Sequence, residues 1–299
     1  MLDVVIIGSG PAGITAAIYA KRANLNVAVV EKEYLGTGQI AESSRVDNYP
    51  GIPGIDGYSL GEKFREHAES LGVEFTEAQV LSLGQKDGIW IIGCDEDITL
   101  ESKAVIYATG CKNRPLGVPG EEKYYGRGLS FCAVCDGAFY KGKRVAVIGG
   151  GDTALDDAMY LSDICEKVYL VHRREFFRGS ASTLEKLKQK ENVEIIVNVR
   201  VEEITGDKKI DGIILDNKTK LNISGLFAAV GMIPQTELLK EFGVLDESNY
   251  VKASEDTKTT VNGLFAAGDV RTKQLRQVVT AAADGANAIY SVKEYLRNI

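Results

Sequence analysis

The sequence predicts an α/β fold of two Rossmann-like dinucleotide-binding domains, each with a small β insertion, the second domain being inserted into the first. Two observations lead to this prediction. A pattern of strand, glycine-rich turn, helix and strand occurs twice, and a further strand and an Ala-rich helix follow the second copy. The 299 residues are enough for two domains of ordinary size.

Composition narrows the class of protein. Hydrophobic residues make up 44% and charged residues 26%, which is typical of a globular protein. The net charge of −7 disfavours nucleic acid or an anionic membrane as a partner, and no apolar run approaches the length of a membrane span. Met1-Leu2-Asp3 has no basic lead-in, so no secretory signal is expected. Five cysteines provide no even disulfide framework, which favours a reducing, cytoplasmic location.

The first copy of the pattern begins at the N-terminus. The β-branched run Val4–Ile7 predicts a buried parallel strand. The turn Gly8-Ser9-Gly10-Pro11-Ala12-Gly13 follows, then an Ala-rich helix from Ile14 to about Ala23. A second strand, Val27–Val30, ends at Glu31, 21 residues after the second glycine of the turn.

This arrangement predicts a dinucleotide site. The glycines allow the backbone to approach a pyrophosphate, the helix N-terminus faces its negative charge, and Glu31 accepts the ribose hydroxyls. An acid at that position would repel a ribose 2′-phosphate, so the first copy predicts FAD or NAD.

Two stretches connect the first copy to the second. Gly36-Thr37-Gly38-Gln39 and Asp47–Gly51 are polar and rich in turn formers, and we expect them to form loops over the site. Alternating strands such as Ile89–Ile92 fill the region from Val73, which closes on Val105–Gly110.

A Cys-x-x-Cys motif, Cys132-Ala133-Val134-Cys135, precedes the second copy and is followed directly by Asp136. The spacing brings two sulfurs close enough for a disulfide and often lowers a thiol pKa, so we interpret it as a redox pair. The alternative is half of a zinc site, which needs a second pair of ligands. The remaining cysteines and both histidines are isolated; they are Cys94, Cys111, Cys165, His67 and His172.

The second copy starts with the strand Val145–Ile148 and the turn Gly149-x-Gly151-x-x-Ala154. A helix to about Cys165 and a strand, Val168–Val171, follow. Where the first copy has an acid, this copy has His172-Arg173-Arg174 and then Arg178. A basic cluster attracts a 2′-phosphate, so the second copy predicts NADP; the alternative is a solvated charge cluster.

The duplication continues beyond these motifs. Val193–Ile196 corresponds to the start of the first β region, and Ala228–Gly231 corresponds to Tyr107–Gly110. The last strand ends in Gly268-Asp269, and the Ala-rich helix from Ala281 to about Leu296 follows it. A second nucleotide fold does not need this extra helix, and an acid at a strand end next to a helix N-terminus suits a polyol and a diphosphate, as in FAD. We therefore predict an FAD-binding domain of residues 1–113 and 243–299, and an inserted NADPH-binding domain of residues 114–242 that carries the cysteines and is joined by two linkers.

These motifs, in this order, closely resemble the low-molecular-weight thioredoxin reductases, flavoproteins of the pyridine nucleotide-disulfide oxidoreductase class. The resemblance covers essentially the whole chain, and it includes Asn48-Tyr49-Pro50-Gly51, Ala108-Thr109-Gly110 and Arg276-Gln277 besides the motifs above. It implies FAD, NADPH, a homodimer and a thioredoxin-like partner. The chain departs from the family pattern at Thr37, Cys111, Asp156-Asp157 and Gly179.

The resemblance also implies roles for individual residues. Electrons pass from NADPH through FAD to the Cys132–Cys135 pair and then to a partner disulfide, while the inserted domain rotates on its linkers. Cys135 lies against the flavin, Cys132 attacks the partner, and Asp136 carries protons. The implied FAD ligands are Gly8, Ser9, Gly10, Pro11, Ala12, Gly13, Glu31, Lys32, Gly38, Gln39, Asn48, Val80, Ala108, Thr109, Gly110, Gly268, Asp269, Arg276, Gln277 and Val278. The implied NADPH ligands are Arg114, Gly149, Gly151, Asp152, Thr153, Ala154, His172, Arg173, Arg174 and Arg178.

Three alternatives remain at this stage. The protein is a flavin disulfide reductase fed by ferredoxin, or a flavin-dependent ferredoxin–NADP reductase, or a zinc-bound or redox-sensing adaptor without enzymatic activity. Relatives of the second kind lack the cysteine pair, so Cys132 and Cys135 argue against it.

Overall fold

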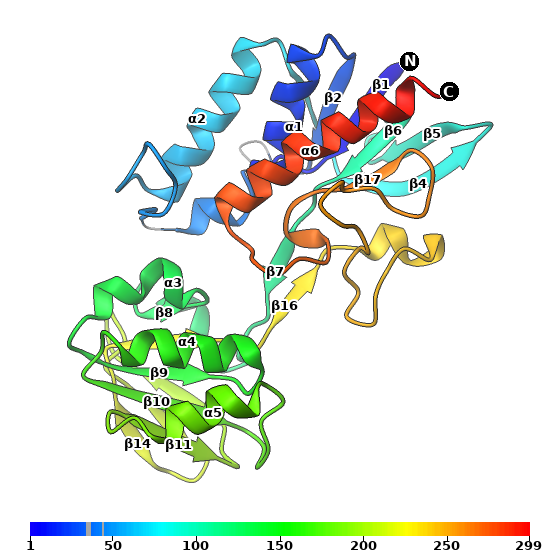
Figure 1. Ribbon diagram of the computed structural model, residues 1–299. Coiled ribbons are helices and arrows are strands. Elements are labelled where there is room, and N and C mark those ends of the chain that lie inside the picture. The colour runs from blue at the N-terminus through cyan, green and yellow to red at the C-terminus, as the bar shows by residue number, and fades with distance from the viewer. Residues whose placement is uncertain (34–36, 44) are drawn as a thin grey trace. The chain divides into compact units, whose positions relative to one another are not determined.

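The computed structural model describes residues 1–33, 37–43 and 45–299, so Gly36 of the predicted loop lies outside the described residues. The chain divides into two compact units (Figure 1). The first comprises Met1–Lys112 and Ile233–Ile299, and the second comprises Asn113–Met232. Both are α/β units with a parallel sheet, as predicted.

The second boundary differs from the prediction. Residues 233–242 belong to the first unit, although the sequence pattern assigned them to the insertion. This segment forms a 3₁₀ helix, η4 (Glu237–Phe242), whose Leu239 is fully buried in a core cluster with Val244 and Leu264. Burial of that apolar side chain keeps the segment with the first unit.

A seven-stranded sheet forms the centre of the first unit. Five strands run parallel in the order β3 (Glu74–Glu77), β2 (Val27–Glu31), β1 (Leu2–Ile7), β6 (Thr99–Tyr107) and β17 (Leu264–Ala266). β5 (Ile89–Cys94) and β4 (Val80–Lys86) add an antiparallel extension. The first half of β6 pairs with β5 and its second half pairs with β1 and β17, so one long strand joins the β insertion to the nucleotide fold.

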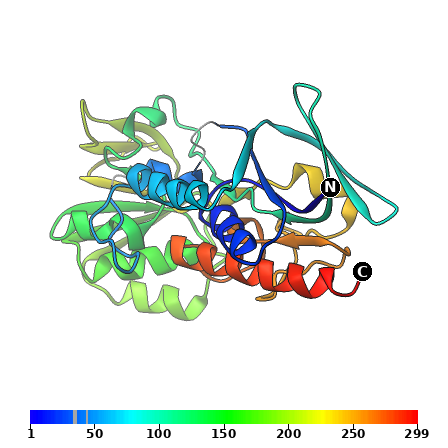
Figure 2. The same cartoon turned by 90° about the horizontal axis from the view of Figure 1, so that it is seen from above.

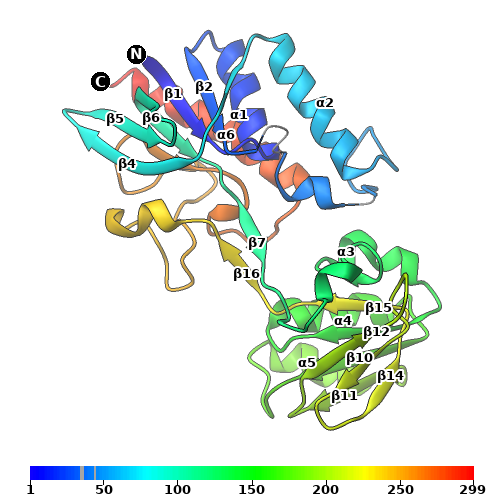
Figure 3. The same ribbon diagram turned by 180° about the vertical axis from the view of Figure 1, so that it is seen from behind.

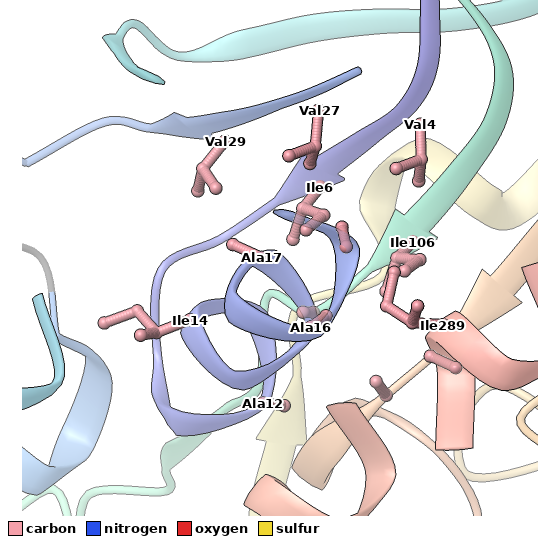
Figure 4. Close-up of a cluster of buried hydrophobic side chains, with 14 of the residues drawn as sticks. Val4, Ile6, Ala12, Ile14, Ala16, Ala17, Val27, Val29, Ile106 and Ile289 are labelled. Carbon is pink, nitrogen blue, oxygen red and sulfur yellow. The ribbon is translucent and has the colours of Figure 1, made fainter. Parts of the chain in front are cut away.

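Among the described residues of this unit, the helices that cover the sheet are α1 (Pro11–Arg22), α2 (Gly57–Ser70) and α6 (Val278–Leu296), and α1 lies between the other two (Figures 1 and 2). The α1–α6 crossing is close, since a Cβ on Gly285 would lie 2.2 Å from the carbonyl oxygen of Ala12. Figure 4 shows apolar side chains of β1, β2 and β6 facing α1 and Ile289 of α6. None of the described helices has the length and apolar character needed to cross a membrane.

The second unit repeats this plan. Its parallel sheet has the order β11 (Val193–Val197), β10 (Lys167–His172), β9 (Arg144–Ile148), β15 (Gly225–Ala228) and β8 (Leu129–Ser130). Its helices are α3 (Ala133–Asp136), α4 (Asp152–Ser162) and α5 (Ala181–Lys188), and its β insertion is the antiparallel set β12 (Val201–Thr205), β13 (Gly212–Leu215) and β14 (Lys220–Asn222). Short 3₁₀ helices complete the two units: η1 (Gly38–Glu42), η2 (Glu121–Tyr124), η3 (Gly137–Tyr140) and η5 (Gly268–Val270).

The chain passes between the units through two short strands. β7 (Cys111–Asn113) and β16 (Met232–Pro234) pair with each other as a two-stranded sheet (Figure 3). Arg114 continues this pairing within the second unit, because its N–H donates to the carbonyl oxygen of Gly231 at 3.1 Å. The predicted linkers are therefore hydrogen-bonded strands.

Candidate active site

The first glycine turn joins β1 to α1, and its geometry requires glycine at two positions. Gly8 has φ of +101°, and a Cβ there would lie 2.6 Å from the carbonyl oxygen of Ala108. A Cβ on Gly13 would lie 1.9 Å from the carbonyl oxygen of Gly8. Gly10 is the N-cap of α1, and among the described residues other than its chain neighbours the nearest atoms to such a Cβ lie 3.9 Å away, so its backbone is open toward the helix N-terminus.

Glu31 ends β2 with its carboxylate held in place. Its Oε2 accepts hydrogen bonds from the N–H of Ser9 at 2.9 Å and from the Ser9 hydroxyl at 3.0 Å. Its Oε1 accepts from the N–H of Lys32 at 2.8 Å. The N–H of Glu33 also donates to Oε1, at 3.3 Å, so four hydrogen bonds fix the orientation of this carboxylate at the end of β2. The Lys32 side chain extends instead to a solvent-exposed ion pair with Glu33.

Asp269 provides the clearest sign of a ligand in the first unit. Its Oδ1 is buried and has no hydrogen-bond partner among the described residues, and burial raises the pKa of the carboxyl group. A buried acceptor without a donor is costly, and hydroxyls of a bound polyol would satisfy it. The Arg276 guanidinium stacks 4.2 Å from the ring centre of Tyr250, and its Nε donates to the carbonyl oxygen of Asp269 at 3.3 Å.

Residues far apart in the sequence meet beside this turn. The Asn48 side-chain amide donates to Oε1 of Gln277 at 2.8 Å, across 229 residues of chain. Gln277 is the N-cap of α6, so Asn48 borders the start of that helix at Val278. A Cβ on Gly38 would lie 3.2 Å from Cα of Gly10, which places the start of η1, with Gln39, against the glycine turn.

The loop after β6 completes this side of the sheet. Ala108 is buried against Gly8, the Thr109 hydroxyl donates to the carbonyl oxygen of Gln235 at 2.7 Å, and Gly110 has φ of +66°. Val80 lies at the start of β4, two residues beyond the backbone contact of Ala78 with Glu31. With open backbone at Gly10, a free acceptor at Asp269 and the fixed Glu31, the first unit fits a nucleotide that has a diphosphate and free hydroxyls.

Cys111, one of the departures from the family pattern, is an inert thiol. It is buried, its sulfhydryl donates to the carbonyl oxygen of Asp269 at 3.0 Å, and burial raises its pKa to about 11. The thiolate is the reactive form of cysteine, so this residue remains a protonated structural donor near neutral pH.

The sequence pattern did not predict a buried ionic network centred on Asp284, which contacts the turn that carries Asp269. Asp284 of α6 accepts from Arg271 at 2.6 and 2.8 Å, from Lys273 at 2.9 Å and from the N–H of Gly268 at 2.9 Å. The three side chains are 3–5% exposed. The available signal was an acid on the apolar face of an Ala-rich helix, between Ala281 and Ala288.

The second glycine turn, between β9 and α4, has the same build. A Cβ on Gly149 would lie 2.4 Å from the carbonyl oxygen of Ala229 and 2.7 Å from Cβ of Ala154, so position 149 admits only glycine. Gly151 is the N-cap of α4, and apart from its own chain neighbours the described part of the chain places nothing within 4 Å of its Cβ position, so the start of the helix is open. Thr153 is exposed in the first turn of that helix.

Gly179 is explained by the same turn. A Cβ there would lie 2.8 Å from the backbone nitrogen of Asp152, which leaves no space for the alanine that is usual in the family. Oδ1 of Asp152 accepts from the N–H of Ser180 at 2.7 Å. The side chain of Asp152 thus holds the loop at Gly179 and Ser180 against the start of α4.

The basic cluster after β10 divides into two parts. Arg173, Arg174 and Arg178 are exposed and form no ion pair within the described part of the chain, which leaves their guanidinium groups available to an anion. His172 is buried, and burial lowers its pKa, with the neighbouring arginines adding to the effect. The predicted positive charge at this position therefore comes from the arginines.

Cys132 and Cys135 form a disulfide with a Cα–Cα distance of 5.3 Å. Cys132 is the N-cap of α3, and its sulfur accepts from the N–H of Cys135 at 3.2 Å. Both cysteines are partly exposed, and Val134 and Phe139 beside them are 55% and 41% exposed. An accessible disulfide with apolar neighbours suits exchange with another protein.

Asp136 is half-buried next to this disulfide. Its N–H donates to the carbonyl oxygen of Cys132 at 3.1 Å. Burial raises the pKa of its carboxyl group, while a hydrogen bond with Ser130 opposes the rise. A carboxyl group with a raised pKa exchanges protons more readily near neutral pH than an ordinary aspartate does. On α4, burial and Asp156 raise the pKa of Asp157 to about 7.

Comparison with known proteins agrees with this geometry. The family model described as pyridine nucleotide-disulphide oxidoreductase matches residues 2–285. The thioredoxin reductase of Bacillus subtilis is 38% identical over 305 residues, covering 99% of this chain and 95% of that protein. A 34.2 kDa protein in the rubredoxin operon of Clostridium pasteurianum is 39% identical over 303 residues, with 99% and 97% covered. The crystal structure of thioredoxin reductase from Streptococcus pyogenes has a TM-score of 0.93 at 40% identity, covering 100% of this chain and 99% of that one.

Proposed function

The chain belongs to the pyridine nucleotide-disulphide oxidoreductase family, and from this membership we propose that it transfers electrons from NADPH, through FAD and the Cys132–Cys135 pair, to a thioredoxin-like protein disulfide. The chain is an oxidoreductase that uses a flavin and a pyridine nucleotide. The observation that carries the finer proposal is the partly exposed disulfide, which lies in the same unit as an open nucleotide-binding turn.

For the flavin we propose FAD, held by the first unit. Glu31 accepts the adenosine ribose hydroxyls, the N-terminus of α1 faces the diphosphate, and Oδ1 of Asp269 accepts a hydroxyl of the ribityl chain. When bound, the flavin supplies two-electron chemistry that a dithiol lacks, because it accepts a hydride from a nicotinamide and passes electrons to a disulfide.

For the nucleotide we propose NADPH, held by the second unit. The open N-terminus of α4 faces the diphosphate, and Arg173, Arg174 and Arg178 surround the 2′-phosphate with charge-assisted hydrogen bonds. An acid at the position of His172, as Glu31 provides in the first unit, would repel the 2′-phosphate and select NADH over NADPH.

The cysteines then act by thiol–disulfide exchange. The Cys132 thiolate attacks one sulfur of the partner disulfide, which forms a mixed disulfide and releases the other partner sulfur as a thiolate. The Cys135 thiolate attacks the sulfur of Cys132, which restores the intramolecular disulfide and releases the second partner sulfur. Two electrons have reached the partner, and its sulfurs take up two protons. Asp136 carries protons in these steps, and its raised pKa supports that role.

The test is a set of anaerobic titrations of the purified protein. We expect a flavin absorbance spectrum with one FAD per chain, rapid reduction by NADPH and slow reduction by NADH. Oxidised thioredoxin should then reoxidise the reduced protein. Reduction by reduced ferredoxin but not by NADPH would replace this proposal with the ferredoxin-fed reductase, and absence of flavin would overturn it.

We also propose that the protein is a homodimer in the cytoplasm, because the resemblance implies the dimer and the odd number of cysteines favours a reducing compartment. Sedimentation equilibrium of the purified protein tests the dimer: a mass near twice 32.4 kDa supports it, and a mass near the single-chain value contradicts it.

A further inference from the structure

His172 is the last residue of β10 and is only 7% exposed, whereas the three arginines that follow it are exposed. Its position in the sequence groups it with them as a ligand for a phosphate. Its surroundings in the structure set it apart from them.

One side of the imidazole holds the arginine-bearing loop, residues 173–178. Its Nε2 lies 3.2 Å from the carbonyl oxygen of Phe176. A carbonyl oxygen only accepts, so Nε2 carries a proton and donates it to this bond. The ring also packs on Phe177, with 4.9 Å between the ring centres and 34° between the planes.

The other side of the imidazole rests on the second glycine turn. A Cβ on Gly150 would lie 2.2 to 2.5 Å from three atoms of the His172 ring, so that position admits only glycine while the ring is there. The carbonyl oxygen of Gly150 accepts from the N–H groups of Arg178 at 2.7 Å and Gly179 at 3.2 Å. The ring and these two bonds together join the turn to the loop.

Burial, together with the arginines nearby, favours the neutral form of the imidazole ring. Burial is the largest influence on the His172 pKa and lowers it, and Arg174, Arg173 and Arg178 lower it further, while the Phe176 carbonyl opposes them. A neutral imidazole, with its Nε2 proton engaged by Phe176, brings no positive charge to a phosphate.

We propose that His172 is a positioning residue that holds the loop of Arg173, Arg174 and Arg178 in register with the Gly149–Gly151 turn, and that the arginines alone bind the 2′-phosphate. This inference rests on the proposed use of NADPH. The turn would bind the diphosphate and the loop the 2′-phosphate, so their separation decides whether one nucleotide reaches both.

The experiment measures binding of adenosine 2′,5′-bisphosphate to the full-length protein by calorimetry, between pH 5.5 and 8.5. Three variants are compared with the unchanged protein. His172→Gln keeps a donor near the position of Nε2 but carries no charge, His172→Ala removes the ring, and Arg174→Gln removes a phosphate ligand. Thermal unfolding and the flavin spectrum report whether each variant is folded.

We expect His172→Gln to bind within about threefold of the unchanged protein at every pH, and His172→Ala to bind at least about tenfold more weakly because the loop is no longer ordered before binding. A loss in His172→Gln that is large at pH 5.5 and disappears by pH 8.5 would make His172 a cationic ligand and overturn the proposal. Unchanged binding by a folded His172→Ala would overturn it as well. If the unchanged protein binds adenosine 5′-phosphate as tightly as the bisphosphate, the 2′-phosphate is not recognised and the proposed use of NADPH is wrong. That result comes from the unchanged protein, so it is distinguishable from the results with the two His172 variants.

Discussion

Replacing Asp284 by asparagine tests whether the buried ionic network stabilises the flavin-binding unit. Asp284 is 3% exposed and is the shared partner of Arg271, Lys273 and the N–H of Gly268. Asparagine has nearly the same shape but no charge, so it leaves two buried cations without their shared carboxylate. Breaking a buried ion pair from one side costs about 3–5 kcal/mol, because the remaining charge is desolvated without compensation.

The same helix offers a matched control. Glu294, also on α6, pairs with Lys258 at 3.0 Å, but both side chains are more than 40% exposed. Glu294→Gln should therefore cost less than about 1 kcal/mol, because water already solvates both partners of an exposed pair.

Urea unfolding followed by tryptophan fluorescence measures both effects. The chain has one tryptophan, Trp90, which is fully buried in the first unit, so its emission reports on the unfolding of that unit alone. The unfolding of the two domains is then not fitted as a single transition. Visible absorbance of the released flavin gives a second signal. Asp284 accepts from the N–H of Gly268, in the turn that carries the proposed flavin ligand Asp269, so loss of the carboxylate should also weaken flavin binding. An Asp284→Asn variant as stable as Glu294→Gln would refute the assignment of a structural role to the network.

Three further predictions concern the site. Cys132→Ser and Cys135→Ser should each abolish reduction of a thioredoxin disulfide while NADPH still reduces the bound flavin; activity in either variant would make the disulfide structural. Replacing Arg173 and Arg174 with glutamine should raise the KM for NADPH far more than that for NADH, with a loss on the order of 1.5–3 kcal/mol for each charge-assisted contact. Equal changes in both KM values would place the arginines outside the 2′-phosphate site. Asp136→Asn should slow transfer from the dithiol to thioredoxin on the order of 10²–10⁴-fold without slowing flavin reduction. Because burial raises the pKa of this acid, the folded state loses stability as pH rises from the unfolded pKa, about 3.9, through the folded pKa. Asp136→Asn should therefore unfold at a higher temperature than the unchanged protein at pH 8 but not at pH 3. If Asp136→Asn transfers electrons to thioredoxin at the rate of the unchanged protein and with the same pH profile, Asp136 is a turn residue and not a proton carrier.

Local sequence patterns predicted both glycine turns, because their determinants lie within about thirty residues of chain. A strand, a turn that admits only glycine, a helix and a second strand form one continuous unit, as Gly8 and Gly149 illustrate. The Cys132–Cys135 disulfide was predictable for the same reason, since two residues separate its cysteines.

The sequence alone therefore determined the α/β class, the duplication and the redox pair, because short-range spacing specifies them. Only the tertiary structure decided which distant residues meet: Asn48 with Gln277, and Asp284 with Arg271 and Gly268. It also decided that Leu239 brings residues 233–242 into the first unit. Burial is a property of the packed chain, and a charge or an apolar side chain acquires its energetic consequence only when its neighbours replace water.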